Sequence, residues 1–497
     1  MPQKPIELPT ELYSATFHPK HTMAPRYSSV AVIGAGPSGI SAVKALSEEK
    51  AFDRIQVFDR RHRSGGTWIY DEEPEPFSTS SSQPVREIPE KLPLSLPPAS
   101  ENLTARTGLY PSLDSNVGSQ VMAFTYKPFP SVNSATSINR FGKGNPTHPC
   151  AEVAGYLEEI AEPFSHLFTF NTHVERVEKV GKTWRLTLRK TPHYLKDGKR
   201  DYWWQDTFDA VVVATGHYGV PYVPKIAGLE ETFAALPSRF EHSKAYRSPE
   251  DYVNKKVVVV GGNVSASDTV SEIHNIVSGP LYVSQRSYNE ILKDAWELPN
   301  VVRKPQIARV SVGPDNLVRV SFADGTEADG VEKVHFGTGY RLSYPFLRPD
   351  PVTPSGRLAG FYQHVFNVAD PSLAVVGQVK AAISFRVYEY QAVAVARYFA
   401  NRGGGLPSPR EQDEWEVKRL QYKGPTSQFH EIKPDFKEYF DFLRQVAGEP
   451  APGTEAYELP AWQDEWALLG FGVLSLKQKW WRELKEKEQN TPIQAKL

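Results

Sequence analysis

The stretch VAVIGAGPSGI, residues 30–40, places three glycines directly after a run of small apolar residues. Gly34 permits a tight turn, Gly36 allows a pyrophosphate to approach the backbone, and Gly39 allows a helix to pack closely on the preceding strand. The following helix would point its free N–H groups and the positive end of its dipole at that pyrophosphate. The spacing therefore matches the dinucleotide-binding turn G-x-G-x-x-G.

The flanking residues agree with this interpretation. Residues 30–33 are predicted to form a buried strand, residues 40–46 the start of a helix, and residues 55–58 the next strand. That second strand ends at Asp59, where a carboxylate would accept hydrogen bonds from ribose hydroxyls. A glycine pattern alone could be a tight turn in a core, but these four features together favour nucleotide binding.

Composition narrows the class of protein. The chain has 497 residues, of which 40% are apolar, so two or three domains with a large core are expected. A formal net charge of −1 gives no reason to expect a nucleic acid or an anionic membrane as a partner. The single cysteine, Cys150, excludes an internal disulfide framework and a paired-cysteine redox centre.

The same features bear on location. The N-terminal residues have no apolar core suited to a secretory signal, and the best candidate for a membrane span, residues 466–476, is shorter than the roughly 18 residues required. We therefore expect a cytoplasmic protein that does not enter a membrane. The histidines lack the spacing of metal ligands, so no metal site is predicted.

The middle of the chain divides into distinct segments. Residues 71–135 are rich in Pro and Ser and predict a long surface insertion. A helix is expected where apolar residues recur between 153 and 160, and the alternating stretches 183–190 and 201–208 predict a hairpin. A long helix is expected over residues 384–400, whereas the tail after it has no assigned fold.

A second glycine turn lies in VVVVGGNVSASD, residues 257–268. Gly261 supplies the tight turn and Ala266 is the permitted small residue at the third position. Asn263 replaces the middle glycine. Asn tolerates left-handed backbone geometry better than most residues, and its amide can donate a hydrogen bond to phosphate, so this turn is altered but still able to bind.

The next strand, LYVSQR at residues 281–286, indicates what the second turn binds. It ends in Ser284 and Arg286 with no carboxylate, and both side chains could bind a 2′-phosphate that a carboxylate would repel. A solvated surface arginine is the alternative interpretation of Arg286. The first site thus suits FAD and the second NADPH, which implies electron transfer from NADPH to FAD.

Similar strand ends at residues 208–218 and 334–340 flank the second turn, which predicts that the NADPH domain is inserted into the FAD domain. The fold class is α/β with two dinucleotide-binding, Rossmann-like domains. The predicted segments are an N-terminal extension (1–27), the first part of the FAD domain (28–220), the NADPH domain (221–335), the second part of the FAD domain (336–400) and a C-terminal extension (401–497).

Over roughly residues 28–400 the chain resembles the flavin-containing monooxygenases. GAGPSG and FDRRHRSGGTW (58–68) resemble the FAD segment of that family, and TGLYPSLDSNVGSQVMAF (107–124) resembles the segment that carries its catalytic asparagine. Asn116 is the counterpart here; a turn asparagine, a common role for this residue type, is the alternative interpretation. FEHSKAY (240–246) keeps the second half of the family fingerprint, but Leu236 and Ser238 replace its Phe and Gly.

The resemblance implies a set of cofactor-binding residues. For FAD these are Gly34, Gly36, Pro37, Ser38, Gly39, Asp59, Arg60, Gly66, Thr67, Trp68, Asn116, Val174, Ala214, Thr215, Gly216 and Gln378. For NADP they are Tyr218, Gly262, Asn263, Ser265, Ala266, Ser284, Arg286, Thr338 and Gly339.

The resemblance also implies the reaction. One oxygen atom of O2 would pass, through a flavin hydroperoxide, to a nucleophilic nitrogen or sulfur of a small molecule. Baeyer–Villiger oxygenation of a ketone and a non-catalytic FAD/NADP redox sensor are the alternatives. Tyr246 stands where Baeyer–Villiger enzymes would be expected to have Trp, which favours heteroatom oxygenation. A homodimer is a further possibility, with residues 71–135 and 401–497 covering the flavin pocket or forming the contact.

Overall fold

The computed structural model describes residues 27–80, 82–83, 85–191 and 200–490. The predicted N-terminal extension, residues 1–27, lies outside this part except for Tyr27, whose ring packs edge-on against Phe399.

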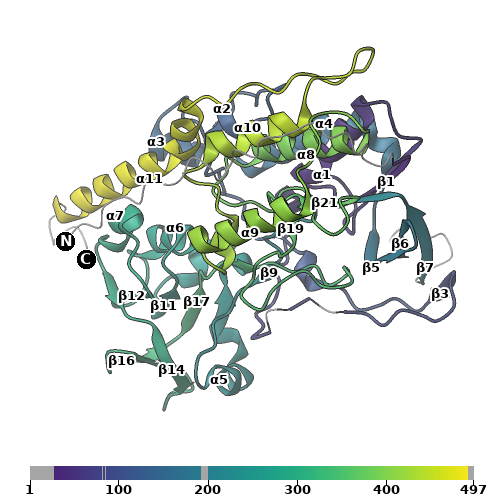
Figure 1. Ribbon diagram of the computed structural model, residues 1–497. Coiled ribbons are helices and arrows are strands. Elements are labelled where there is room, and N and C mark those ends of the chain that lie inside the picture. The colour runs from purple at the N-terminus through teal and green to yellow at the C-terminus, as the bar shows by residue number, and fades with distance from the viewer. Residues whose placement is uncertain (1–26, 81, 84, 192–199, 491–497) are drawn as a thin grey trace.

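A mostly parallel sheet forms the centre of the first domain (Figure 1). Its middle strand β1 (Ser29–Ile33) pairs with β2 (Arg54–Phe58) on one side and β8 (Ala210–Val213) on the other. The remaining strands are β4 (Phe168–Thr169), β19 (Phe361–Tyr362), β20 (Phe366–Asn367) and β21 (Leu373–Val375). The order β19-β20-β21-β8-β1-β2-β4 collects strands from both sides of the second domain in sequence.

The alternation of side chains along β1 explains the layers. Val30 and Val32 face a helical layer, whereas Ala31 and Ile33 face an antiparallel sheet. The helices of this domain are α1 (Pro37–Glu48), α4 (Cys150–Ala161) and α8 (Phe385–Phe399). The sheet has the order β3 (Leu94–Leu96), β7 (Asp201–Phe208), β6 (Thr183–Lys190), β5 (Thr172–Val180), so the predicted hairpin is confirmed.

The second domain has its own parallel sheet. Its strands, in order, are β10 (Phe240–His242), β17 (Lys333–Phe336), β11 (Val257–Val260), β12 (Leu281–Ser284) and β13 (Val301–Lys304). An antiparallel sheet of β14 (Ile307–Val312), β15 (Val318–Phe322) and β16 (Glu327–Val331) accompanies it. Its helices are α5 (Leu229–Ala235), α6 (Val264–Ile273) and α7 (Lys293–Trp296).

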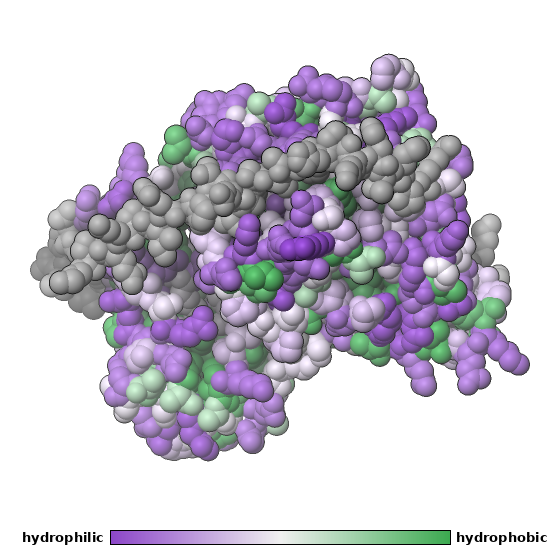
Figure 2. All heavy atoms as spheres, in the orientation of Figure 1, coloured by the Kyte–Doolittle hydropathy of each residue, from purple (hydrophilic) through white to green (hydrophobic). Residues whose placement is uncertain are grey.

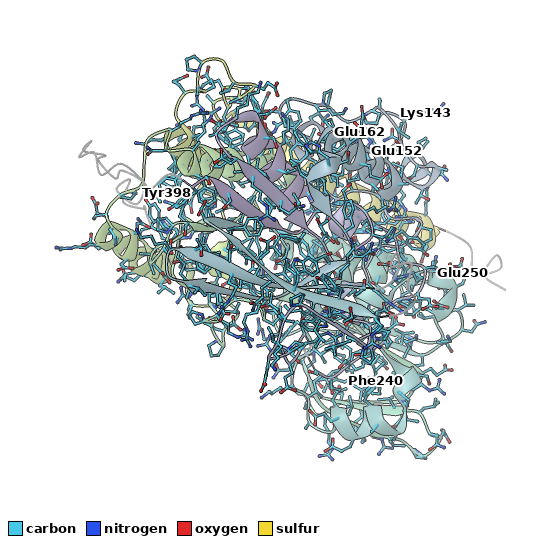
Figure 3. The ribbon with its side chains drawn as sticks, turned by 90° about the vertical axis from the view of Figure 1, so that its right-hand side faces the viewer. Lys143, Glu152, Glu162, Phe240, Glu250 and Tyr398 are labelled. Carbon is cyan, nitrogen blue, oxygen red and sulfur yellow. The ribbon has the colours of Figure 1, made fainter. Side chains whose placement is uncertain are left out.

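The chain enters this domain at β9 (Val220–Pro221) and leaves it at β18 (Tyr340–Arg341), and these two strands pair with each other. Figure 3 shows the two domains; Phe240 marks the second domain and Tyr398 marks α8 of the first. The predicted fold class is confirmed: two Rossmann-like domains, the second inserted into the first.

The prediction that residues 71–135 form a surface loop is wrong for its later part. Val121, Met122 and Phe124 are each only 1% exposed, because α2 (Ser119–Met122) packs into the first domain. Glu75, near the start of the segment, is held by Lys244, whose buried Nζ also donates to the Gly219 carbonyl oxygen at 2.5 Å. The segment is therefore fastened to the chain that links the two domains.

The unassigned tail is helical. It forms α9 (Pro409–Lys423), α10 (Phe436–Ala447) and α11 (Glu465–Asn490). α10 packs on α8, while α11 runs from α2 and α3 (Ala135–Phe141) to α7 of the second domain (Figure 1). Trp481 is fully buried among side chains of the second domain.

Short 3-10 helices interrupt the loops. They are η2 (Gly66–Trp68), η3 (Leu103–Ala105), η4 (Glu162–Leu167), η6 (Pro237–Arg239), η7 (Ser243–Ala245), η8 (Pro249–Tyr252), η9 (Glu290–Leu292) and η10 (Ser427–His430).

On the face drawn in Figure 2, hydrophobic residues form small patches among hydrophilic ones. Among the described helices, none is both long and apolar enough to cross a membrane. In the same described ranges, no group of three or more His, Cys, Asp or Glu side chains could hold a metal ion.

Candidate functional site

One cavity of about 1650 Å³ lies between the two domains and is lined by both glycine turns. A single small ligand occupies a pocket of roughly 300–1,000 Å³, so this volume suits two larger ligands side by side. Most of the predicted site residues line it: Gly34, Gly36, Pro37, Ser38, Asp59, Arg60, Gly66, Thr67, Trp68, Asn116, Val174, Ala214, Thr215, Gly216, Tyr218, Gly262, Asn263, Ser265, Ser284, Arg286, Thr338 and Gly339.

Three predicted residues lie behind the cavity wall. Gly39 and Ala266 pack each turn against its own domain. Gln378 is 1% exposed, and its Oε1 accepts a hydrogen bond from the Tyr344 hydroxyl at 2.8 Å. Its neighbours Gly377 and Val379 do line the cavity.

The first turn is a tightly packed cradle of glycines. A Cβ at Gly39 would lie 1.8 Å from the Gly34 carbonyl oxygen, and a Cβ at Gly66 would lie 2.6 Å from the Gly36 Cα. No side chain of the described residues caps the N-terminus of α1 at Gly36. Free N–H groups at an uncapped helix end beside such bare backbone fit a pyrophosphate, as FAD carries.

Asp59 is held firmly at the tip of β2. Its Oδ2 accepts the Ala35 N–H at 2.6 Å and its Oδ1 accepts the Arg61 N–H at 2.7 Å. Each carboxylate oxygen has a further lone pair, so the group can also accept hydrogen bonds from ribose hydroxyls. Its position on the cavity wall fits the ribose of a dinucleotide bound at the first turn.

The second turn reaches the same backbone path with different small residues. In the first domain Gly39 packs near Ala214, where a Cβ at Gly39 would lie 3.7 Å from that of Ala214. In the second, Ala266 packs against Gly337, where a Cβ at Gly337 would lie 2.9 Å from that of Ala266. The alanine methyl group thus belongs to the loop residue Ala214 in the first domain and to the helix residue Ala266 in the second. Close packing of helix and strand is therefore kept without the third glycine.

Asn263 acts as the N-cap of α6. Its backbone is extended, with φ −128°, so the left-handed geometry that we considered for this residue is not used. Its Oδ1 accepts the Val264 N–H at 2.9 Å, and in the described part of the chain its Nδ2 has no protein partner. Asn is among the preferred N-cap residues, so the replaced glycine is compatible with a working turn.

Replacing Asn263 with alanine is expected to cost about 1 kcal/mol in the free energy of unfolding, because the cap is lost. Asn263→Gly, which restores the common motif, should cost only a few tenths of that and should still allow reduction by NADPH. Urea unfolding and anaerobic flavin reduction of both variants measure this. Equal stability of Asn263→Ala and the unaltered protein would show that the cap contributes nothing.

The strand after the second turn presents two predicted phosphate ligands differently. Ser284 is buried, and its hydroxyl donates to the Pro305 carbonyl oxygen at 3.0 Å, so its proton is already used. Arg286 is exposed and lines the cavity. The guanidinium of Arg286 is therefore the better placed group for a 2′-phosphate.

Asn116 lies in a bend that is held on both sides. The Ser115 N–H donates to the His148 carbonyl oxygen at 2.8 Å, and the Gly118 N–H donates to the Gly470 carbonyl oxygen at 3.3 Å. The Asn116 side chain itself is exposed on the cavity wall. Its amide can both donate and accept a hydrogen bond there.

His242 braces the joint between the domains. Its Nε2 donates to the Gly339 carbonyl oxygen at 2.9 Å, and its Nδ1 accepts the Lys244 N–H at 3.1 Å. Burial lowers the pKa of His242 to about 3. The ring is thus neutral at physiological pH and takes a structural rather than a proton-transfer role.

The remaining single residues have simple roles. Trp68 lines the cavity and packs edge-on against Phe385, with ring centroids 6.1 Å apart. Tyr246 is buried and packs edge-on against Tyr110. Cys150 is the buried first residue of α4, and burial raises the pKa of its thiol.

Sequence reasoning offered residues 401–497 as a possible cover of the flavin pocket but named none of the tail residues that line the cavity. Gly470, Phe471, Leu474 and Lys477 of α11 all line the cavity. These residues belong to a segment that we could not assign, and no known motif marks them.

Comparison with protein families agrees with this geometry. A family model described as flavin-binding monooxygenase-like matches residues 100–300 and 284–451. A second model, for an NAD(P)-binding Rossmann-like domain, matches residues 32–80.

Individual relatives are similar over most of their length. Flavin-containing monooxygenase iboF of Amanita muscaria is 28% identical, over 83% of this chain and 84% of its own. Flavin-containing monooxygenase FMO GS-OX5 of Arabidopsis thaliana is 29% identical, over 86% of both. The solved structure of S-allyl-L-cysteine S-oxygenase from Allium sativum has a TM-score of 0.68 and 25% identity, and covers 94% of this chain and 98% of its own.

Proposed function

Because the chain belongs to the flavin-binding monooxygenase-like family and is an FAD-dependent monooxygenase that uses NADPH, we propose the following reaction. The enzyme transfers one oxygen atom of O2 to a nucleophilic sulfur or nitrogen of a small molecule. The observation that carries this proposal is the shared cavity. Both glycine turns and Asn116 open on it, so a nicotinamide donor, a flavin and a substrate can meet in one space.

When bound, FAD supplies the redox chemistry, since it accepts a hydride from NADPH and lets O2 be divided between product and water. The residues of the chain bind and orient. In the proposal, the N-terminus of α1 and Gly36 hold the pyrophosphate of FAD, and Asp59 accepts hydrogen bonds from its ribose. Arg286 selects NADPH through its 2′-phosphate.

Asn116 is proposed to orient the reacting groups through its amide. The bend that carries it is fixed at Ser115 and Gly118, so the side chain is presented to the cavity from a rigid support. A positioned hydrogen-bonding group on a fixed backbone lowers the cost of reaching the reactive geometry. The surrounding walls keep bulk water away from the reacting atoms.

Sulfur is the first atom to test. The Allium sativum protein, which is similar over 94% of this chain, is named an S-oxygenase. Thioethers are also neutral and small, so they can enter the cavity without a charged partner. An amine series then tests nitrogen as the alternative acceptor.

Replacing Asn116 with alanine is expected to lower the yield of sulfoxide per NADPH consumed by roughly 10- to 100-fold, because loss of one positioned hydrogen bond costs about 1.5–3 kcal/mol. Anaerobic flavin reduction by NADPH, followed as bleaching near about 450 nm, should be nearly unchanged. Methyl phenyl sulfide, O2 uptake and hydrogen peroxide are measured together. The nearly isosteric Asn116→Asp removes the amide N–H groups and adds a negative charge, and it serves as the companion variant.

The outcomes separate the alternatives. Sulfoxide formation by the unaltered enzyme supports the proposal. An unchanged yield of sulfoxide per NADPH in Asn116→Ala would show that Asn116 has no part in it. Ester formation from a ketone without sulfoxide would establish Baeyer–Villiger chemistry. Reduction without any oxygenated product would favour a sensor.

A further inference from the structure

One face of α11 forms part of the cavity wall. Gly470, Phe471, Leu474 and Lys477 line the cavity; Leu474 lies four residues after Gly470, three after Phe471 and three before Lys477, which places them on one side of the helix. With a rise of about 1.5 Å per residue, they cover roughly 10 Å of wall. Figure 1 shows α11 crossing from the first domain to the second at this point.

The N-terminal half of this face is fastened to the segment that carries Asn116. Beside the hydrogen bond from Gly118 to Gly470, a Cβ at Gly118 would lie 2.2 Å from the Leu469 carbonyl oxygen, so the two backbones touch. Gly470 also lies directly on Ile383, since a Cβ at Gly470 would lie 3.4 Å from Ile383 Cγ2. Phe471 follows at once in the sequence and lines the cavity; its ring also contacts Phe436, with centroids 6.1 Å apart, and Lys433 Nζ, 5.1 Å from the ring centroid.

The other half is fastened to the second domain. Lys477 Nζ donates to both oxygens of Asp268 on α6, at 2.7 and 2.9 Å. Gln478 Nε2 donates to the Ile291 carbonyl oxygen at 2.5 Å, next to the loop that follows Arg286. The apolar residues Phe471 and Leu474 thus lie between the Asn116 bend and the helix of the second glycine turn.

We propose that Phe471 and Leu474 are substrate-selecting residues, which pack against the apolar part of the molecule whose sulfur or nitrogen is oxygenated. This inference rests on the proposed function of the same cavity. An apolar surface beside a positioned amide suits a substrate with one hydrocarbon arm and one nucleophilic atom, such as an alkyl aryl sulfide. The ion pair of Lys477 and Asp268 closes the far end of this surface, because each charge already has its partner.

The test compares two sulfides of different size, dimethyl sulfide and methyl phenyl sulfide, in the FAD-loaded enzyme. The ratio of their kcat/KM values is unaffected by a general loss of activity, because both react with the same reduced enzyme. Phe471→Ala is expected to lower the ratio of aryl to dimethyl sulfide by roughly tenfold, through the KM of the aryl sulfide, since a lost hydrocarbon contact acts on binding. Phe471→Leu should restore part of it.

Leu468→Ala is the matched control. It lies on the same helix, is 77% exposed and does not line the cavity, so its ratio should stay within about twofold of the unaltered enzyme. Leu474→Ala provides a second variant where Phe471→Ala fails to fold. A ratio in both cavity variants that matches Leu468→Ala would overturn the proposal.

A binding measurement separates this proposal from the proposed function. Methyl phenyl sulfide is titrated into the oxidised enzyme without NADPH, and the shift of the flavin absorption band gives a Kd. A Kd raised several-fold in Phe471→Ala but not in Leu468→Ala supports the selecting role even where no sulfoxide forms. An unchanged Kd in Phe471→Ala together with normal sulfoxide formation would support the proposed function but show that α11 does not select the substrate.

Discussion

Gly39→Ala is expected to abolish FAD binding. A Cβ at this position would lie 1.8 Å from the Gly34 carbonyl oxygen, an overlap with backbone that no side-chain rotation can relieve. α1 must then move away from β1, which displaces its N-terminus from the pyrophosphate position. The variant should emerge from gel filtration with less than about a tenth of the flavin absorbance near 450 nm per protein, and should unfold at lower urea concentration.

Gly155→Ala is the control for this substitution. Gly155 lies inside α4, and a Cβ there would have no heavy atom within 4 Å. Alanine in such a helix position should stabilise the protein by roughly 0.5–1 kcal/mol and leave the flavin content unchanged. If Gly39→Ala retained its flavin as well as Gly155→Ala does, the first turn would not be the FAD site.

Arg286→Ala is expected to lower kcat/KM for NADPH by roughly 10- to 100-fold and to leave that for NADH within about twofold. The reason is that only NADPH carries the 2′-phosphate that the guanidinium would bind. The rate of anaerobic flavin bleaching at several concentrations of each nucleotide measures the change. Flavin content is checked first, because Arg286 lies far in sequence from the first turn and should not alter it.

Arg309→Ala separates a specific contact from a general change of charge. Arg309 is an exposed arginine of the same domain that does not line the cavity. Its removal should change neither nucleotide by more than about twofold, apart from a small effect at low salt. A parallel loss for NADPH and NADH in Arg286→Ala would assign this arginine to the shared part of the nucleotide, not to its phosphate.

The two glycine turns were predictable because their chemistry is local. In both, a strand, a turn and a helix follow one another within a few residues, and in the first turn Gly39 is required by the Gly34 carbonyl oxygen inside that unit. The exchange of Gly39 and Ala214 for Ala266 and Gly337 is different. It joins residues far apart in sequence, so the replaced glycine at position 266 could be accepted from the sequence but its compensation could not be seen.

The tail could not be assigned from sequence because α11 serves two partners. Trp466 packs against the first domain and Trp481 inside the second, while residues between them face the cavity. An apolar pattern divided among three surroundings has no single helical stripe. The buried residues 121–124 escaped prediction for a related reason, since they follow a long stretch rich in Pro and Ser that favours an exposed loop.

The second domain is attached at the paired strands β9 and β18, at α11, and by contacts such as the Arg140–Glu272 and Lys244–Glu75 ion pairs. β9 and β18 are adjacent, paired strands, so together they behave as one hinge, and a part held only by a hinge can still swing about its axis. α11 adds a second attachment away from that axis, through the buried Trp481 and the ion pairs of Lys477 and Arg482. We therefore expect the two nucleotide sites to keep a fixed mutual orientation while the contacts of α11 with the second domain are intact. Any rotation of the second domain should begin with the loss of these contacts.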